Sequence, residues 1–189
     1  MNAYLQLEER FRTIATLEDA AGMLHWDAAT MMPLGSAEDR HEQLAVITTI
    51  RHDMLSSSET GELLAAALDT DALTNWQRAN LREMERRYIH ATAVETPLVT
   101  ALSKASNACE TSWRRARAAN DFDVLKPLLA EVLSLSREAA QAKAERLGCT
   151  PYDALMDQFT PGLRTDIVDT LFDRLGRELP DLLSEILEH

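Results

Sequence analysis

His41 and Glu42 lie in a segment whose residue types could support metal-dependent hydrolysis. In the HExxH motif of zinc peptidases, two histidines one helical turn apart bind the same zinc ion, and the glutamate between them acts as the base. Ala45 occupies the position of the second histidine in this chain. Because one imidazole would hold zinc weakly, we expect His41 to lie partly exposed in the first turn of a helix without binding metal.

Glu38 and His41 also match half of a carboxylate-bridged di-iron site. Such a site needs two Glu-x-x-His pairs and two further glutamates that point into a helix bundle. Three other histidines lack a glutamate three residues earlier, where Gly22, Thr49 and Arg87 precede His25, His52 and His90. The second pair is therefore missing, and a di-iron bundle is kept only as an alternative that measured iron content would test.

The run His25-Trp26-Asp27 could suggest a catalytic acid or base. The sequence contains no Gly-x-Ser-x-Gly motif, phosphate-binding glycine loop or dinucleotide fingerprint that such a group would serve. We therefore expect Trp26 to pack in the core. We expect Asp27 to pair with Arg40, since the two residues flank the turn that runs from Met31 to Ser36.

Two groups of arginines raise the question of anion binding. They are Arg82, Arg86 and Arg87, and Arg114, Arg115 and Arg117. Neighbouring acids and the lack of interleaved aromatic residues favour solvated helix faces with local ion pairs over an anion site. The net charge of −12 also disfavours binding to a nucleic-acid backbone.

The composition favours an all-α protein. Only 5% of the 189 residues are aromatic, glycine and proline number six each, and alanine, leucine, glutamate and arginine recur throughout. Cys109 and Cys149 have no CxxC spacing, which indicates reduced thiols of a cytoplasmic protein. We see no secretion signal and no apolar run near 18 residues, so membrane spanning is not expected.

Apolar residues that recur every three or four positions predict seven or eight amphipathic helices with short connections. The expected helices cover about 2–29, 36–55, 58–68, 75–93, 97–118, 122–147, 151–156 and 165 onward, with Pro180 kinking or dividing the last. The expected N-caps are Ser36 with Asp39 as a capping box, Ser58, Thr74 with Gln77, Thr96, Thr150 and Thr165. Gly148 fits a left-handed helix stop. No break is long enough for a domain linker.

Several ordered segments together resemble the carboxypeptidase Taq family of metallocarboxypeptidases. They are Leu24-x-Trp26-Asp27, Met32-Pro33-x-Gly35, Arg40-x-Glu42-Gln43-Leu44-Ala45, Ala79-Asn80-Leu81-Arg82-Glu83, Trp113-x-x-Ala116-Arg117, Asn120-Asp121-Phe122 and Pro151-Tyr152-Asp153-Ala154-Leu155-x-Asp157 with Pro161-Gly162. One departure is Thr160, which stands where the family tends to have a glutamate. The resemblance runs over nearly the whole chain.

The resemblance implies that residues 1–186 are the N-terminal helical region of such an enzyme, forming a wall or lid of its substrate groove. The family's HExxH helix lies in the second half of a longer chain, so this fragment is expected to have no catalytic, cofactor-binding or metal-binding residue and to be inactive. The full-length protein would be a cytoplasmic homodimer that binds zinc, or another divalent metal such as cobalt, and acts on peptides. Residues 187–189 resemble the junction before a histidine tag. A stand-alone helical interaction module is the alternative.

Overall fold

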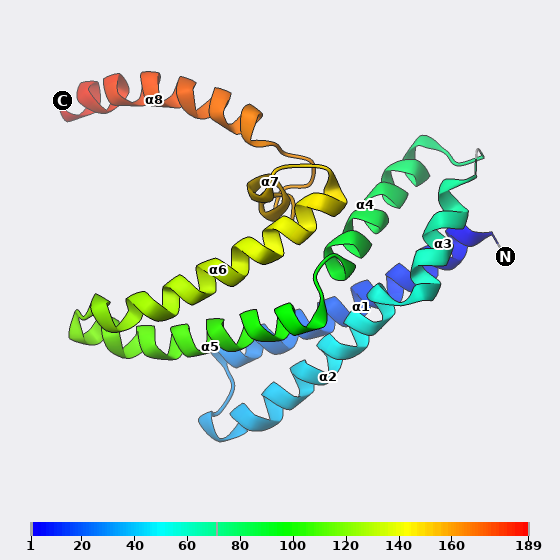
Figure 1. The fold of residues 1–189 in the computed structure, drawn as a ribbon, viewed down its shortest axis with the longest axis horizontal. Helices are drawn as coiled ribbons and strands as arrows, with labels where there is room; N and C mark the ends of the chain where they lie inside the picture. The colour runs from blue at the N-terminus through cyan, green and yellow to red at the C-terminus, as the bar shows by residue number, and fades with distance from the viewer. Residues whose placement is uncertain (1, 71, 189) are drawn as a thin grey trace. The chain divides into compact units, whose positions relative to one another are not determined.

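The computed structural model describes residues 2–70 and 72–188, and within them the chain forms eight α-helices and no strand. The helices are α1 (Ala3–Thr30), α2 (Ala37–Ser56), α3 (Ser58–Leu68), α4 (Asn75–Thr92), α5 (Thr96–Ala119), α6 (Phe122–Leu147), α7 (Pro151–Met156) and α8 (Thr165–Leu187), with a 3-10 turn η1 (Leu34–Ser36) before α2 (Figure 1). The predicted all-α fold is confirmed. The chain divides between Thr92 and Ala93 into two compact units.

The first unit is built on α1, which packs against α2 and α3, while α4 packs against α2 and α3. Its core takes residues from several helices and from the α3–α4 connection: Tyr4, Leu7, Phe11, Leu64, Ala67, Leu73, Leu81 and Met84. The predicted spacing of three or four residues along α1 therefore does mark its buried face.

Trp26 does not pack in this core, contrary to the sequence-based expectation, because 58% of its surface is exposed. The α1 residues of the core cluster lie between Tyr4 and Phe11, where α3 and α4 also contribute side chains, and Ile14 and Ala21 are the buried residues beyond them. Trp26 lies near the C-terminal end of α1, where the turn leads into α2. A residue far from the convergence of several helices finds too few neighbours to be covered.

In the second unit α5 and α6 form an antiparallel pair, and α7 packs on α6 (Figure 1). Small residues allow the close approach of these helices: Ala105, Ser112 and Ala116 on α5, and Ala139, Ala140 and Ala144 on α6. Two left-handed residues end the helices, Asn120 after α5 and Gly148 after α6. The predicted stop at Gly148 is confirmed.

Two of the predicted N-caps form as expected. The Thr74 hydroxyl accepts from the Gln77 backbone N–H at 3.3 Å, and the Gln77 side chain accepts from the Thr74 backbone N–H at 2.9 Å, which completes a capping box. The Thr150 hydroxyl accepts from the Asp153 backbone N–H at 3.2 Å, with Pro151 as the first residue of α7.

The other predicted caps differ from expectation. Ser36 occupies the N-cap position of α2, but it belongs to a 3-10 turn with φ −98° and ψ 7°, so it lacks the extended backbone that a capping side chain needs, and no side-chain cap forms. Ser57 caps α3 in place of Ser58, and Glu95 precedes α5 in place of Thr96. These last two displacements are single residues, within the usual uncertainty of helix ends.

Two expectations concern α8. The helix runs through Pro180, so the proline does not divide it, and the alternative, a kink at Pro180, stays a prediction. Thr165 is the first helical residue and not the cap. Its backbone N–H donates to the Asp153 carboxylate of α7 at 2.8 Å, so a residue from another helix satisfies the end of α8.

Candidate functional site

The residues that suggested metal chemistry are exposed on their helices. Glu38, His41 and Glu42 lie along the beginning of α2, and all three side chains face solvent. His25 is exposed on α1 and His52 on α2. Within residues 2–70 and 72–188, no three His, Cys, Asp or Glu side chains come together in a way that could hold a metal ion. The donor set in this part of the chain does not fit a metal site.

Asp27 and Arg40 form the ion pair that the sequence predicted. The Asp27 Oδ2 and Arg40 Nη1 atoms are 2.5 Å apart, and Arg40 also donates to the Leu24 carbonyl at 3.0 Å and to the Gln43 side chain at 3.1 Å. The Arg40 side chain is mostly buried, with 17% of its surface exposed. The contacts hold the last turns of α1 against the start of α2, which is a structural role.

Arg86, Arg87 and Arg114 of the two arginine clusters pair with acids, as expected. Arg86 contacts Glu83, and Arg114 contacts Glu110 on its own helix. Arg87 of α4 shares Glu18 of α1 with Arg51 of α2, at 2.7 and 2.9 Å respectively. Glu18 therefore links three helices of the first unit through charge-assisted hydrogen bonds.

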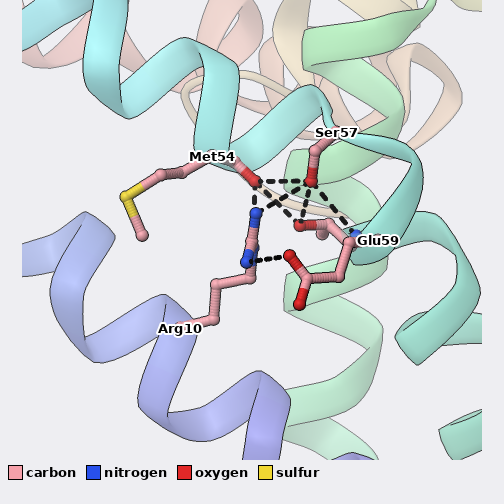
Figure 2. A network of polar contacts seen from close by, with 5 residues as sticks. Arg10, Met54, Ser57 and Glu59 are labelled. Carbon is pink, nitrogen blue, oxygen red and sulfur yellow. Dashed lines mark hydrogen bonds and ion pairs between the residues drawn. The ribbon is translucent and has the colours of Figure 1, made fainter.

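A network around Arg10 joins α1 to the α2–α3 junction, and sequence reasoning missed it (Figure 2). The Arg10 guanidinium donates to the Met54 carbonyl at 3.1 Å, the Ser57 hydroxyl at 2.9 Å and the Glu59 carboxylate at 2.7 Å. The fully buried Thr60 hydroxyl donates to the same Met54 carbonyl at 2.7 Å. These bonds satisfy a carbonyl at the end of α2 and fix the entry of α3.

A signal for this network was present in the sequence. Arg10 lies three residues after Leu7 and four before Ile14, so it falls on the buried face of the α1 helix. A cation on such a face needs a partner, and the Ser-Ser-Ser run at 56–58 supplied polar groups for it. Sequence spacing alone does not show that the two segments meet.

Asp153 and Asp157 form the most buried polar group of the second unit. Asp153 is 5% exposed and Asp157 is 6% exposed. Asp153 accepts from the Thr165 backbone N–H, and Asp157 accepts from the Gly162 backbone N–H at 2.8 Å. The bond from Thr165 is the main reason that the pKa of Asp153 is lowered from its ordinary value. The two carboxylates fix the turn between α7 and α8 and need not react with a ligand.

An open hollow lies beside the turn between α5 and α6. Trp113, Arg117, Asn120, Asp121, Phe122 and Leu125 line it together with Ala116. The Arg117 guanidinium lies 5.6 Å from the centre of the Trp113 ring, a cation–π contact. Phe122 is 60% exposed. The hollow presents apolar surface and one paired cation, without an acid–base pair suited to catalysis.

Comparison with known proteins assigns the chain to a family. The sequence model of the carboxypeptidase Taq (M32) metallopeptidase family matches residues 6–189. The chain belongs to this family. As a carboxypeptidase Taq family member it resembles thermostable carboxypeptidase 1 of Pyrococcus furiosus, with 30% identity over 185 residues, and thermostable carboxypeptidase 1 of Thermus thermophilus, with 32% identity over 196 residues.

Solved structures of other proteins share the backbone fold of this chain. The metallocarboxypeptidase 1 of Trypanosoma cruzi matches the whole chain with a TM-score of 0.93 at 30% identity, and a carboxypeptidase of Pyrococcus furiosus matches it with 0.90 at 28%. The chain covers 36% and 38% of the two thermostable carboxypeptidases, and 38% and 37% of these two solved chains. This carboxypeptidase Taq family chain therefore spans little more than a third of its relatives' length.

In the described part of the chain, no helix is both long enough and apolar enough to cross a membrane. Cys109 and Cys149 form no disulfide bond.

Proposed function

We propose that this chain is the N-terminal region of a metal-dependent carboxypeptidase that removes C-terminal residues from peptides. The observation that carries the proposal is the family match over residues 6–189, combined with coverage of only 36–38% of the thermostable carboxypeptidases. In this proposal residues 1–186 are one helical region that forms a wall or lid of the substrate groove.

The metal-binding residues of the enzyme are proposed to lie outside these 189 residues. Support comes from the chemistry of the donors, because His41 has Ala45 where the HExxH motif requires a second histidine. The metal is zinc, or another divalent ion such as cobalt, and when bound it would activate the water that attacks the peptide. The 189-residue chain by itself is then inactive.

The partners and compartment belong to the same proposal. Peptides are the substrates, and the full-length protein is a cytoplasmic homodimer that binds neither nucleic acid nor membrane. The net charge of −12 supports the exclusion of nucleic acid, since it repels a phosphate backbone.

The test compares the 189-residue chain with the longer polypeptide encoded by the same gene. Both are assayed on an N-terminally blocked dipeptide with added zinc or cobalt, and release of the C-terminal amino acid is measured. A mock purification from the expression host controls for contaminating peptidase. The longer polypeptide should release the amino acid in a metal-dependent way, and the 189-residue chain should not. Metal-dependent release by the short chain above the mock level would refute its proposed inactivity.

A stand-alone helical interaction module is the second candidate. The exposed apolar side chains Trp113 and Phe122 beside the α5–α6 turn favour it, because apolar patches commonly mark protein contacts. The gene sequence distinguishes the carboxypeptidase region from the stand-alone module. A reading frame that continues beyond this region to an HExxH motif contradicts the stand-alone module. Iron bound in stoichiometric amount after purification without chelator would instead support the di-iron bundle.

A further inference from the structure

The last helix, α8, exposes one continuous apolar face. Apolar residues recur along it at steps of three and four, namely Val168, Leu171, Leu175, Leu179, Leu182 and Ile186, with Phe172 and Leu183 beside them. None of the residues of α8 is buried. Ile186 is 62% exposed, although an isoleucine at such a position is ordinarily covered.

The opposite face of α8 is polar and suited to water. It carries Asp166, Asp169, Asp173, Arg177, Asp181 and Ser184. A helix that is polar on one side and apolar on the other normally lies at the surface of a larger body, with the apolar side inward. The second unit provides no such cover, because α5 pairs with α6 and α6 pairs with α7, while α8 buries nothing.

The apolar face is also hollowed. Leu175, Gly176, Leu179, Pro180, Leu182, Leu183 and Ile186 line a shallow apolar concavity along the second half of the helix. Gly176 contributes no side chain, and no atom lies within 4 Å of the position where its Cβ would stand. The concavity can therefore receive a projecting apolar side chain from a neighbouring element.

We propose that the apolar face of α8 is the docking surface for the remainder of the same polypeptide. The inference rests on the proposed function, because it takes the occupant from the part of the carboxypeptidase that this chain does not cover. More than three fifths of each thermostable carboxypeptidase lies outside the matched part. A segment on the same polypeptide is present at a high effective concentration, which favours it over a second copy of the chain.

Hydrogen exchange on the longer polypeptide and on the 189-residue chain tests this docking. At low protein concentration, the backbone amides of α8 should exchange at least ten-fold more slowly in the longer polypeptide, because the cover suppresses opening of the helix. Equal exchange in the two proteins overturns the proposal. Slow exchange in the short chain that depends on its concentration, together with dimers in light scattering, identifies a second copy as the occupant and also overturns it.

A matched pair of substitutions sharpens the test. Leu182→Asp places a charge on the apolar face, and Ser184→Asp places the same charge on the polar face. In the longer polypeptide, Leu182→Asp should lower the thermal midpoint and raise the exchange of α8 towards that of the short chain, while Ser184→Asp should change neither. In the short chain the two variants should have equal helicity by circular dichroism, which controls for loss of the helix itself. Equal effects of the two variants in the longer polypeptide would contradict the docking.

The peptidase assay on the same samples separates this inference from the proposed function. A longer polypeptide that cleaves peptides while α8 exchanges freely refutes only the docking surface. One that protects α8 without releasing C-terminal residues refutes only the peptidase.

Discussion

Asp27 at the end of α1 and Arg40 in α2 lie 2.5 Å apart and join the two helices across the turn between them. The pair crosses a turn whose own capping box does not form, since Ser36 makes no side-chain cap. The guanidinium also bonds the Leu24 carbonyl, so the contact combines a charge pair with a bond to the backbone.

Asp27→Asn should destabilise the chain by about 1 kcal/mol, because a half-buried charge-assisted bond becomes a neutral one. Urea unfolding measures the change. Asp19→Asn, an exposed substitution on the same helix, is the control and should have little effect. If Asp27→Asn and the parent chain unfold at the same urea concentration, the pair does not stabilise the turn.

Arg10→Ala should cost about 2 kcal/mol of stability, because one side chain bonds to three groups at the α2–α3 junction. Arg10→Lys should recover only part of this, since an ammonium group cannot reproduce the planar arrangement of donors. Arg12→Ala removes an exposed pair with Glu9 and serves as the control, with an expected loss of at most about 0.5 kcal/mol. Equal losses at the two positions would contradict the assigned role of Arg10.

Gly61→Ala should destabilise the first unit by about 1 kcal/mol. A Cβ at Gly61 would stand 2.6 Å from the Tyr88 hydroxyl oxygen and 3.1 Å from its ring carbon Cζ, so α3 or Tyr88 must shift. Gly22→Ala is the matched control, because nothing lies within 4 Å of its Cβ position in α1. The control should instead gain up to about 1 kcal/mol from the helix propensity of alanine. Thermal midpoints that move in the same direction would argue against the close approach of α3 and Tyr88.

Asp153→Asn should make stability less dependent on pH in the acid range. The pKa of Asp153 is below its ordinary 3.8 in the folded chain, chiefly because the Thr165 backbone N–H donates to it. The stabilisation that the ionised Asp153 contributes to the folded chain is therefore fully present above pH 3.8. It is lost as the pH falls through the lower pKa that Asp153 has in the folded chain.

Thermal midpoints measured from pH 6 to pH 3 check this prediction. The gap between the parent chain and Asp153→Asn should be widest near pH 6 and narrow towards pH 3. The exposed Asp169→Asn is the control for loss of a carboxylate, and its gap at pH 6 should be small. A gap for Asp153→Asn that widens on acidification would contradict the assigned direction.

Local patterns in the sequence were sufficient for the helices and for some of their contacts. The three- and four-residue spacing of Tyr4, Leu7 and Phe11 predicted a buried face, and Thr74 with Gln77 predicted a capping box, because both depend on residues one turn apart. The Asp27–Arg40 pair was also accessible, since a short turn brings its two flanks together.

Long-range packing accounts for what the sequence missed. The capping of α8 by Asp153 replaces a local cap by a carboxylate from another helix, and no rule of spacing relates Asp153 to Thr165. Trp26 was expected in the core because no catalytic motif accompanies it, yet burial depends on how many helices converge at that point. The ordered family segments predicted the carboxypeptidase Taq membership, which comparison with known proteins confirmed.

Because Asp153 of α7 binds the first residue of α8, the orientation of α8 depends on the position of α7. With 23 residues, α8 extends about 35 Å at a rise of about 1.5 Å per residue. A tilt of about 10° at the Thr165 end would therefore move the Leu187 end by about 6 Å. The six-residue helix α7, together with the turn that its two carboxylates bind, thus sets the direction of α8, a helix several times longer than α7.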